Sequence, residues 1–187
     1  MEKLLLMAVG GAGMNIAEHI KSQFDCVSIA VNSSNTVMKR GNFDMRLPIG
    51  DDLAEGGAFT VEQSRKAAQA SRYAFQRALS GYKQLLIVAG IGGGTGSGAI
   101  PVIIELANAL ETRVIVAVCL PFAFEKERRE TAMSALAELQ TRACTLIVHD
   151  NEVDQQHFGR RDIPMVEFFA LQAQCMAKTI QATLRVE

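Results

Sequence analysis

Continuous apolar runs recur along the chain, and segments with helical patterning separate them. The runs are too apolar to alternate between a buried and a solvent face, which is typical of parallel strands covered on both sides. We therefore expect strands at about 4–9, 27–31, 45–49, 85–89, 113–120 and 144–148. The segments between them predict helices at about 14–23, 61–79, 99–110 and 125–141, and a last helix from about 164 nearly to the end. This alternation predicts the α/β class, as a three-layer sandwich with a mainly parallel, Rossmann-like sheet.

Size, charge and cysteine content narrow the class of protein. The 187 residues have the length of one domain, 1–187, and their 49% hydrophobic content is usual for a globular core. A net charge of −1 gives no indication of nucleic-acid binding. No apolar segment is long enough for membrane insertion, and the first apolar run is too short for a signal peptide. The four cysteines lack metal-ligand spacing, so we expect free thiols and a cytoplasmic protein.

The most informative segment is the glycine-rich run that directly follows the apolar run 85–89. Its candidate ligand-binding residues are Gly92, Gly93, Gly94, Thr95, Gly96, Ser97 and Gly98. Five glycines remove nearly every Cβ, so backbone N–H groups can approach an anion, and the helix expected next directs its dipole there. The alternative is a plain strand-to-helix turn, but a turn needs only one or two glycines. We interpret the run as a phosphate-binding loop.

A second glycine loop is expected at the same edge of the sheet. Ligands of parallel sheets bind at the carboxyl ends of the strands, and the first strand is followed by Gly10, Gly11, Gly13 and Asn15. Gly57 lies in the loop before the helix expected at 61–79. Two converging glycine loops predict a nucleoside di- or triphosphate, or a dinucleotide, as the ligand.

Polar residues follow two further strands at this edge. Glu125 and Arg129 are four residues apart, so they either form an i,i+4 ion pair or hold a ribose and a phosphate. Asn151 follows the sixth expected strand, where it is either a turn residue or an amide that reads a purine edge. The residues alone leave both pairs of alternatives open.

Other nucleotide-binding and catalytic classes find little support. The second strand ends at Val31 and Asn32, without the acidic residue by which nicotinamide-dependent enzymes bind a ribose. The chain has no GxxxxGK[ST] motif, which argues against a Walker-type NTPase. No Ser/His/Asp or Cys/His set gathers at the expected edge. We interpret His19, His149 and His157 as surface or structural residues.

Taken together, the motifs resemble the tubulin/FtsZ superfamily, in particular the N-terminal GTP-binding domain of bacterial FtsZ. The run 92–98 matches its Gly-Gly-Gly-Thr-Gly-Ser-Gly signature. Further matching segments, in the family order and spacing, are 9–15, 30–33, 65–68, 89–91, 121–129 and 146–151. They cover nearly the whole chain.

The resemblance implies GTP or GDP, with Mg²⁺, as the ligand. By matching position, Gly10, Gly11, Gly13, Asn15 and the run 92–98 would line the phosphates, and the loop with Gly57 would sense the terminal phosphate. Glu125 and Arg129 would hold the ribose and a nearby phosphate. Asn151 would pair with guanine, and Phe169 would stack on the base.

The chain departs from the family pattern in three places. The family's base-contacting Asn or Asp falls at Ala173, although a slip of one residue brings Gln172 there instead. The loop at Gly56 and Gly57 is shorter than in the family. The chain stops at Glu187, inside or just past the family's central helix (about 164–187), so we expect the second domain to be absent. The loop that completes the neighbouring subunit's site would be absent too, leaving no catalytic residue and little autonomous GTP hydrolysis.

The last helix carries many apolar residues, and we expect one of its sides to be bare. They are Phe168, Phe169, Leu171, Met176, Ile180, Leu184 and Val186. The chain is then either a piece of a longer protein or a single-domain relative that docks on a partner. The leading hypothesis is a guanine-nucleotide-binding domain linked to filament assembly or its regulation, in cell division or the cytoskeleton, with self-association or an FtsZ-like partner. The alternative is a non-hydrolysing interaction module that docks through the last helix.

Overall fold

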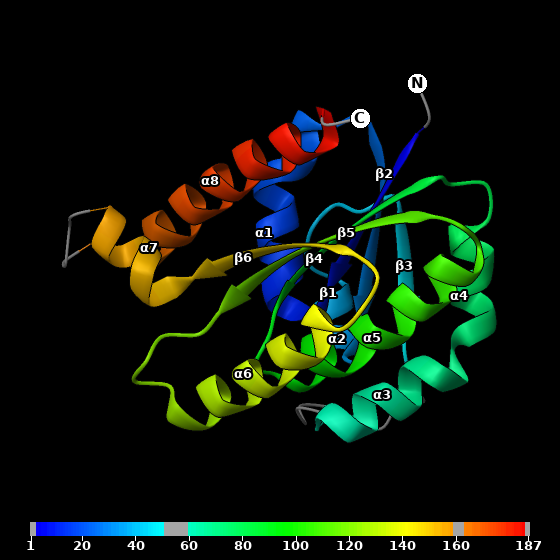
Figure 1. Ribbon diagram of the computed structural model, residues 1–187, viewed down its shortest axis with the longest axis horizontal. Helices are drawn as coiled ribbons and strands as arrows, with labels where there is room; N and C mark the ends of the chain where they lie inside the picture. The colour runs from blue at the N-terminus through cyan, green and yellow to red at the C-terminus, as the bar shows by residue number, and fades with distance from the viewer. Residues whose placement is uncertain (1–2, 51–59, 159–162, 186–187) are drawn as a thin grey trace.

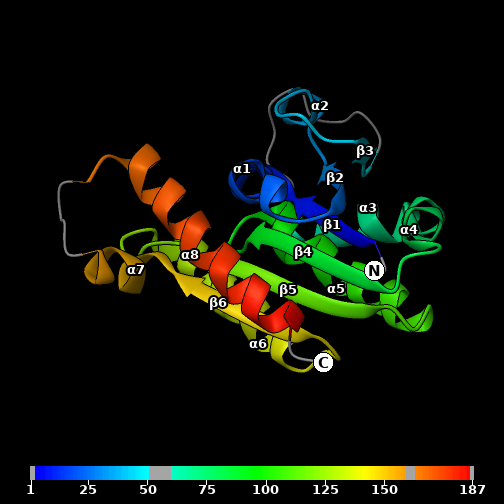
Figure 2. The same cartoon turned by 90° about the horizontal axis from the view of Figure 1, so that it is seen from above.

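Six parallel strands form one sheet at the centre of the molecule. The structure, a computed structural model, describes residues 3–50, 60–158 and 163–185. Its strands are β1 (Leu4–Val9), β2 (Cys26–Asn32), β3 (Met45–Pro48), β4 (Gln84–Gly90), β5 (Arg113–Leu120) and β6 (Thr145–Asp150). Their order is β3-β2-β1-β4-β5-β6, as Figure 2 shows, and all neighbouring pairs are parallel. The predicted α/β class with a parallel, Rossmann-like sheet is confirmed.

Helices cover both faces of this sheet. In chain order they are α1 (Gly10–Ile20), the 3₁₀ helix η1 (Lys21–Gln23), α2 (Asn35–Met38), α3 (Val61–Ala70), α4 (Arg72–Leu79), α5 (Gly94–Ala109), α6 (Lys126–Gln140), α7 (Asn151–His157) and α8 (Met165–Arg185). Figure 1 shows α1 and α8 on one face of the sheet and α3, α5 and α6 on the other. The three predicted layers are therefore present. Among the described residues, no helix has the length and apolar character needed to span a membrane.

Side chains of β1 alternate between two hydrophobic cores, one on each face. Leu5 and Met7 belong to the core that the helices α3 to α6 complete. Leu6 and Ala8 belong to the core under α1 and α8. All residues of β1 are buried, which explains why this strand has a continuous apolar run instead of an alternating pattern.

Both glycine segments form the first turns of helices, whereas the sequence predicted that they lie in loops. α1 begins at Gly10 and α5 begins at Gly94, whereas helices were expected from 14 and 99. Glycine is a poor helix former, so local patterning favours a later start, and packing against the sheet overrides that preference. The helix predicted at 61–79 is also two helices, because α3 ends and α4 begins around Ser71.

The last helix has one apolar face, and most of that face is covered. Phe168, Met176 and Ile180 are fully buried, and α8 lies against α1 and β6. The outer side carries polar residues such as Gln174 and Lys178. The expected bare side is therefore wrong for most of α8, because its apolar residues form a single stripe. Large apolar side chains of α8 are exposed near its start, at Met165, Val166 and Phe169. Val186 lies outside the described residues.

Candidate functional site

Two helix N-termini meet at the carboxyl ends of β1 and β4. These strands are neighbours at the point where the strand order reverses, which is where ligands of parallel α/β sheets bind. α1 follows β1 directly, and α5 follows β4 after a short turn. A Cβ placed on Gly10 would lie 3.6 Å from both the backbone nitrogen of Gly96 and the Cβ of Thr95. The positive ends of two helix dipoles therefore converge, which favours a bound anion.

Three of the predicted site glycines are needed for close packing of helices. A Cβ on Gly13 or Gly96 would lie 2.3 or 2.2 Å from a carbonyl oxygen at the end of β4. A Cβ on Gly98 would lie 2.3 Å from the carbonyl oxygen of Val61 in α3. Glycine at these positions lets α1 and α5 approach β4, and lets α3 approach α5. Packing thus accounts for these three glycines, and their contact with phosphate stays a prediction.

In the turn between β4 and α5, the fold requires the conformation of Gly92 but leaves free space beside Gly93. Gly92 has φ +106°, and its N–H donates to Ser97 Oγ at 2.9 Å. Gly93 has an extended backbone, and no described atom would lie within 4 Å of a Cβ there. The described fold therefore gives no steric reason for glycine at 93, whereas a ligand approaching the backbone would. Thr95 Oγ1 lies 3.0 Å from Ser33 Oγ, which links α5 to the end of β2.

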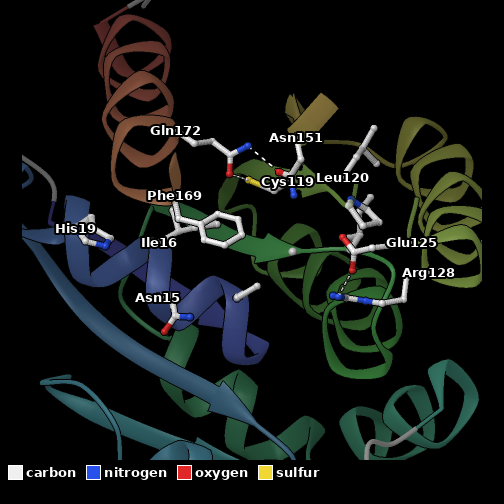
Figure 3. Close-up of a pocket in the computed structure, with 14 residues that line it drawn as sticks. Asn15, Ile16, His19, Cys119, Leu120, Glu125, Arg128, Asn151, Phe169 and Gln172 are labelled. Carbon is white, nitrogen blue, oxygen red and sulfur yellow. Dashed lines mark hydrogen bonds and ion pairs between the residues drawn. The ribbon is translucent and has the colours of Figure 1, made fainter. Parts of the chain in front are cut away.

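A cleft of about 590 Å³, part of it open to solvent, continues from these helix ends between α1 and α8. It brings together four predicted residues: Asn15, Glu125, Asn151 and Phe169 (Figure 3). Phe169 and Ile16 supply apolar surface in the cleft, while the amides and charged groups lie at its ends. Apolar walls with a few polar groups suit a flat heterocyclic ring.

An amide network closes one end of the cleft. Gln172 Nε2 donates to Asn151 Oδ1 at 2.7 Å and to Asp154 Oδ2 at 2.8 Å. The Cys119 thiol donates to Gln172 Oε1 at 3.3 Å. Burial raises the pKa of this thiol, so Cys119 keeps its proton and remains a donor. Gln172 lines the cleft while Ala173 is buried in the core, so the residue that faces the ligand region is Gln172.

Glu125 and Arg129 do not pair with each other, so the i,i+4 ion-pair alternative is wrong. Glu125 accepts the backbone N–H of Phe122 at 3.0 Å and forms an ion pair with Arg128. Arg128 lines the cleft beside Glu125, and Arg129 does not. The sequence singled out Arg129, whereas the basic residue at the cleft is its neighbour Arg128.

Arg129 instead forms an ion pair with Asp150, the residue that precedes Asn151. Its guanidinium donates to both carboxylate oxygens of Asp150, at 2.8 and 2.5 Å. This contact holds the pKa of Asp150 below its ordinary value. The same carboxylate accepts the N–H of Glu152 at 3.0 Å and so caps α7, which begins at Asn151. Arg129 and Asp150 together fix the backbone from which Asn151 reaches the cleft.

The remaining predicted residues have the following places. Gly11 lies in the first turn of α1, and Gly94 is the first residue of α5. Gly57 lies outside the described residues. His19, interpreted above as surface or structural, lines the cleft from α1, one turn after Asn15. Within the described ranges, no group of three or more His, Cys, Asp or Glu residues could hold a metal ion.

Comparisons with known proteins agree on one family. The model of the "Tubulin/FtsZ family, GTPase domain" matches residues 3–156. Cell division protein FtsZ of Neisseria gonorrhoeae is 30% identical over 172 residues, covering 88% of this chain and 43% of the relative. An FtsZ structure from M. jannaschii, described as an empty dimer, has TM-score 0.83 and 26% identity, covering 97% of this chain and 54% of that one. CetZ from Methanosaeta thermophila, at 22% identity and TM-score 0.78, shares the fold. The chain thus spans less than half the length of the curated relative.

Proposed function

Because the chain belongs to the Tubulin/FtsZ family and carries its GTPase domain, we propose that it binds the guanine nucleotides GTP and GDP at the carboxyl ends of β1 and β4. One observation carries this proposal: the N-termini of α1 and α5 converge there, with Gly10 beside Gly96. Two aligned helix dipoles and the exposed N–H groups of the first turns suit a chain of phosphates. The cleft that continues from them suits the nucleoside.

Each part of the nucleotide has matching residues in this arrangement. The phosphates would lie over Gly10, Gly11 and the turn at Gly93, with Mg²⁺ held chiefly by phosphate oxygens and water, as this ion prefers. The base would stack on Phe169 and reach Asn151 at the buried end. Glu125 and Arg128 would lie beside the ribose and the neighbouring phosphate, and Arg129 would act through Asp150.

We further propose that binding, rather than hydrolysis, is the activity of this chain on its own. The Thr95 and Ser97 hydroxyls beside the phosphate region already hydrogen-bond within the protein. The Glu125 carboxylate is paired with Arg128 and the Phe122 N–H. Activating a water needs a general base within hydrogen-bond reach of it, and the Glu125 carboxylate and the Thr95 and Ser97 hydroxyls already have partners within the protein.

Filament assembly is the remaining part of the proposal. The matched family model describes a GTPase domain, and two TubZ structures with this fold are described as protofilaments, one of them in a GTPγS form. We propose that this chain takes part in such assembly, or regulates it, in the cytoplasm, as part of cell division or a related cytoskeletal process. Sedimentation of the protein with GTP, with GDP and without nucleotide tests this part. Pelleting that does not depend on nucleotide would contradict the proposed link.

Isothermal titration with GDP and GTP, with and without Mg²⁺, tests the binding proposal. We expect the variant Gly93→Ala to keep the fold, because no described atom lies within 4 Å of the added methyl group, but it places that methyl where the phosphates would approach. We expect affinity to fall about tenfold, the equivalent of about 1.4 kcal/mol of overpacking. Ser80→Ala, exposed and just before β4 at the opposite edge of the sheet, should leave affinity unchanged. Absence of binding to the unmodified chain at millimolar nucleotide refutes the proposal.

A further inference from the structure

The buried end of the cleft carries three polar side chains whose orientations are interdependent. Asn151, Gln172 and Cys119 are 6%, 1% and 7% exposed, and Figure 3 shows the Gln172 amide facing the other two across dashed hydrogen bonds. Buried groups of this kind keep their hydrogen-bond partners because an unpaired one is costly. Their donors and acceptors therefore define what this end of the cleft offers to a ligand.

A carboxylate fixes the direction of both amides. Asp154 Oδ2 accepts from Gln172 Nε2, and a carboxylate only accepts, so the nitrogen of Gln172 must lie on that side. The Gln172 oxygen then faces Cys119, which donates to it. Because Gln172 Nε2 also donates to Asn151, the oxygen of Asn151 faces Gln172 and its Nδ2 points elsewhere. Within the described residues, Asn151 Nδ2 donates to no protein acceptor.

The cleft thus presents a donor beside an acceptor. The donor is Asn151 Nδ2, and the acceptor is the second lone pair of Gln172 Oε1. A ring that carries a carbonyl next to an N–H is complementary to this pair, and the 6-oxopurines have that edge at O6 and N1–H. Adenine has the opposite pattern. Its amino donor would face the donor Asn151 Nδ2, and its ring acceptor would face the acceptor Gln172 Oε1.

Among the described side chains, a 2-amino group has no comparable partner at this end. The carboxylate of Asp154, which accepts from Gln172 Nε2 and lies 3.0 Å from His149 Nδ1, does not line the cleft. The next residue of α8, Ala173, contributes only a methyl group and is fully buried in the core. At the other end of the cleft, Glu125 is paired with Arg128.

We propose that the base subsite reads the O6/N1–H edge shared by guanine and hypoxanthine through Asn151 and Gln172, and does not read the 2-amino group. This inference rests on the proposed binding of nucleotides. Its consequence is a site that rejects adenine nucleotides and accepts inosine nucleotides about as well as guanine nucleotides. Gln172 is then the residue that determines base specificity in this chain.

Isothermal titration of the full chain with GDP, IDP and ADP tests the inference. We expect IDP to bind within about fivefold of GDP, because no hydrogen bond depends on the 2-amino group. ADP should bind at least about 100-fold more weakly, because its edge leaves buried groups unpaired. A larger gap between GDP and IDP, or an ADP affinity within tenfold of GDP, overturns the inference while leaving nucleotide binding intact. If none of the three binds, the proposed function itself has failed, and the inference with it.

The variant Gln172→Met separates base reading from a general structural role. Methionine keeps the length of the side chain but removes the acceptor and the support of Asn151. We expect GDP and IDP to weaken equally, by about tenfold or more, while ADP affinity stays the same, so the preference over adenine shrinks. Equal weakening of all three nucleotides would show a structural role only and overturn the assignment. Gln174→Met, on the exposed side of the same helix, is the matched control and should change none of the affinities.

Discussion

Replacing Gly98 with alanine adds a methyl group at the contact between α5 and α3. The new Cβ would lie 2.3 Å from the Val61 carbonyl oxygen, 2.8 Å from Ser64 Cβ and 2.9 Å from the Arg65 nitrogen. An ordinary carbon–oxygen contact is about 3.3 Å or longer, so the two helices would have to separate by about 1 Å. Two of the three neighbours are backbone atoms, which cannot rotate away.

The expected cost follows from two opposing effects. Overpacking of a well-packed contact costs about 1–3 kcal/mol, and here the clash is at the upper end because backbone meets backbone. Alanine in place of glycine within a helix regains up to about 1 kcal/mol. We therefore expect Gly98→Ala to lower the free energy of unfolding by about 2 kcal/mol. For a domain of this size, that corresponds to a fall in Tm of about 4–8 °C.

Thermal and urea unfolding of Gly98→Ala, next to Gly93→Ala, measure this cost. Gly93→Ala meets open space at an extended residue, so its stability should stay within about 0.5 kcal/mol of the unmodified chain. An unchanged or raised stability of Gly98→Ala would refute the reasoning, because alanine would then fit between α3 and α5. Comparing the two variants therefore distinguishes a glycine that helix packing requires, Gly98, from one that we expect a ligand to require, Gly93.

Three other outcomes follow from the described contacts. Asp150→Asn should lower stability by about 1 kcal/mol at pH 7, because it removes the ion pair with Arg129. Since Arg129 lowers the pKa of Asp150 in the folded state, this stabilisation is present above the unfolded pKa of about 3.9 and is lost as the pH falls through the folded value. Urea unfolding at pH 7 and pH 3 measures it. Ser64→Ala should raise the free energy of unfolding by about 1 kcal/mol in the same assay, because Ser64 Oγ is buried and has no hydrogen-bond partner among the described residues. Cys119 should react with iodoacetamide at least about tenfold more slowly in the folded protein than in urea, as mass spectrometry can follow, because burial raises its thiol pKa.

Each of these has a result that would contradict it. An equal loss for Asp150→Asn at both pH values would mean that the charge of Asp150 is not what stabilises the fold. A destabilised Ser64→Ala would reveal a partner for that hydroxyl. Rapid alkylation of Cys119 under native conditions would show that the end of the cleft opens readily.

The strands were predictable where burial on both faces leaves a continuous apolar signal. β1 and β5 have the limits that the sequence predicts, 4–9 and 113–120. α7 was not predicted, because the polar run from His149 to Glu152 is typical of a loop. Its start depends on the Asp150 side chain accepting the Glu152 N–H, a contact that spacing alone does not reveal.

The sequence predicted which segments form the site, but it did not always show which of two adjacent residues faces the cleft. The resemblance points to Phe169, which does line the cleft, but the adjacent Phe168 left open whether Ala173 or Gln172 lies beside it. Only the fold buries Phe168 fully and turns Phe169 to the cleft, which places Gln172, one helical turn later, on the same side. The sequence likewise could not show which of the neighbours Arg128 and Arg129 lies at the cleft. The contact with Asp150, 21 residues away, holds Arg129 away from it.

The central pairing of the sheet joins segments that are made at different times. Leu4 lies opposite Gln84, so about 80 residues must be synthesised between the two strands, roughly 4–16 s at ordinary rates. Closing so long a loop costs entropy before its contacts form, which makes such pairings slow. The helix ends at Gly10 and Gly96 meet only when β4 joins β1. A nucleotide would therefore act late in folding, trapping this pairing once it has formed instead of guiding the first half of the chain.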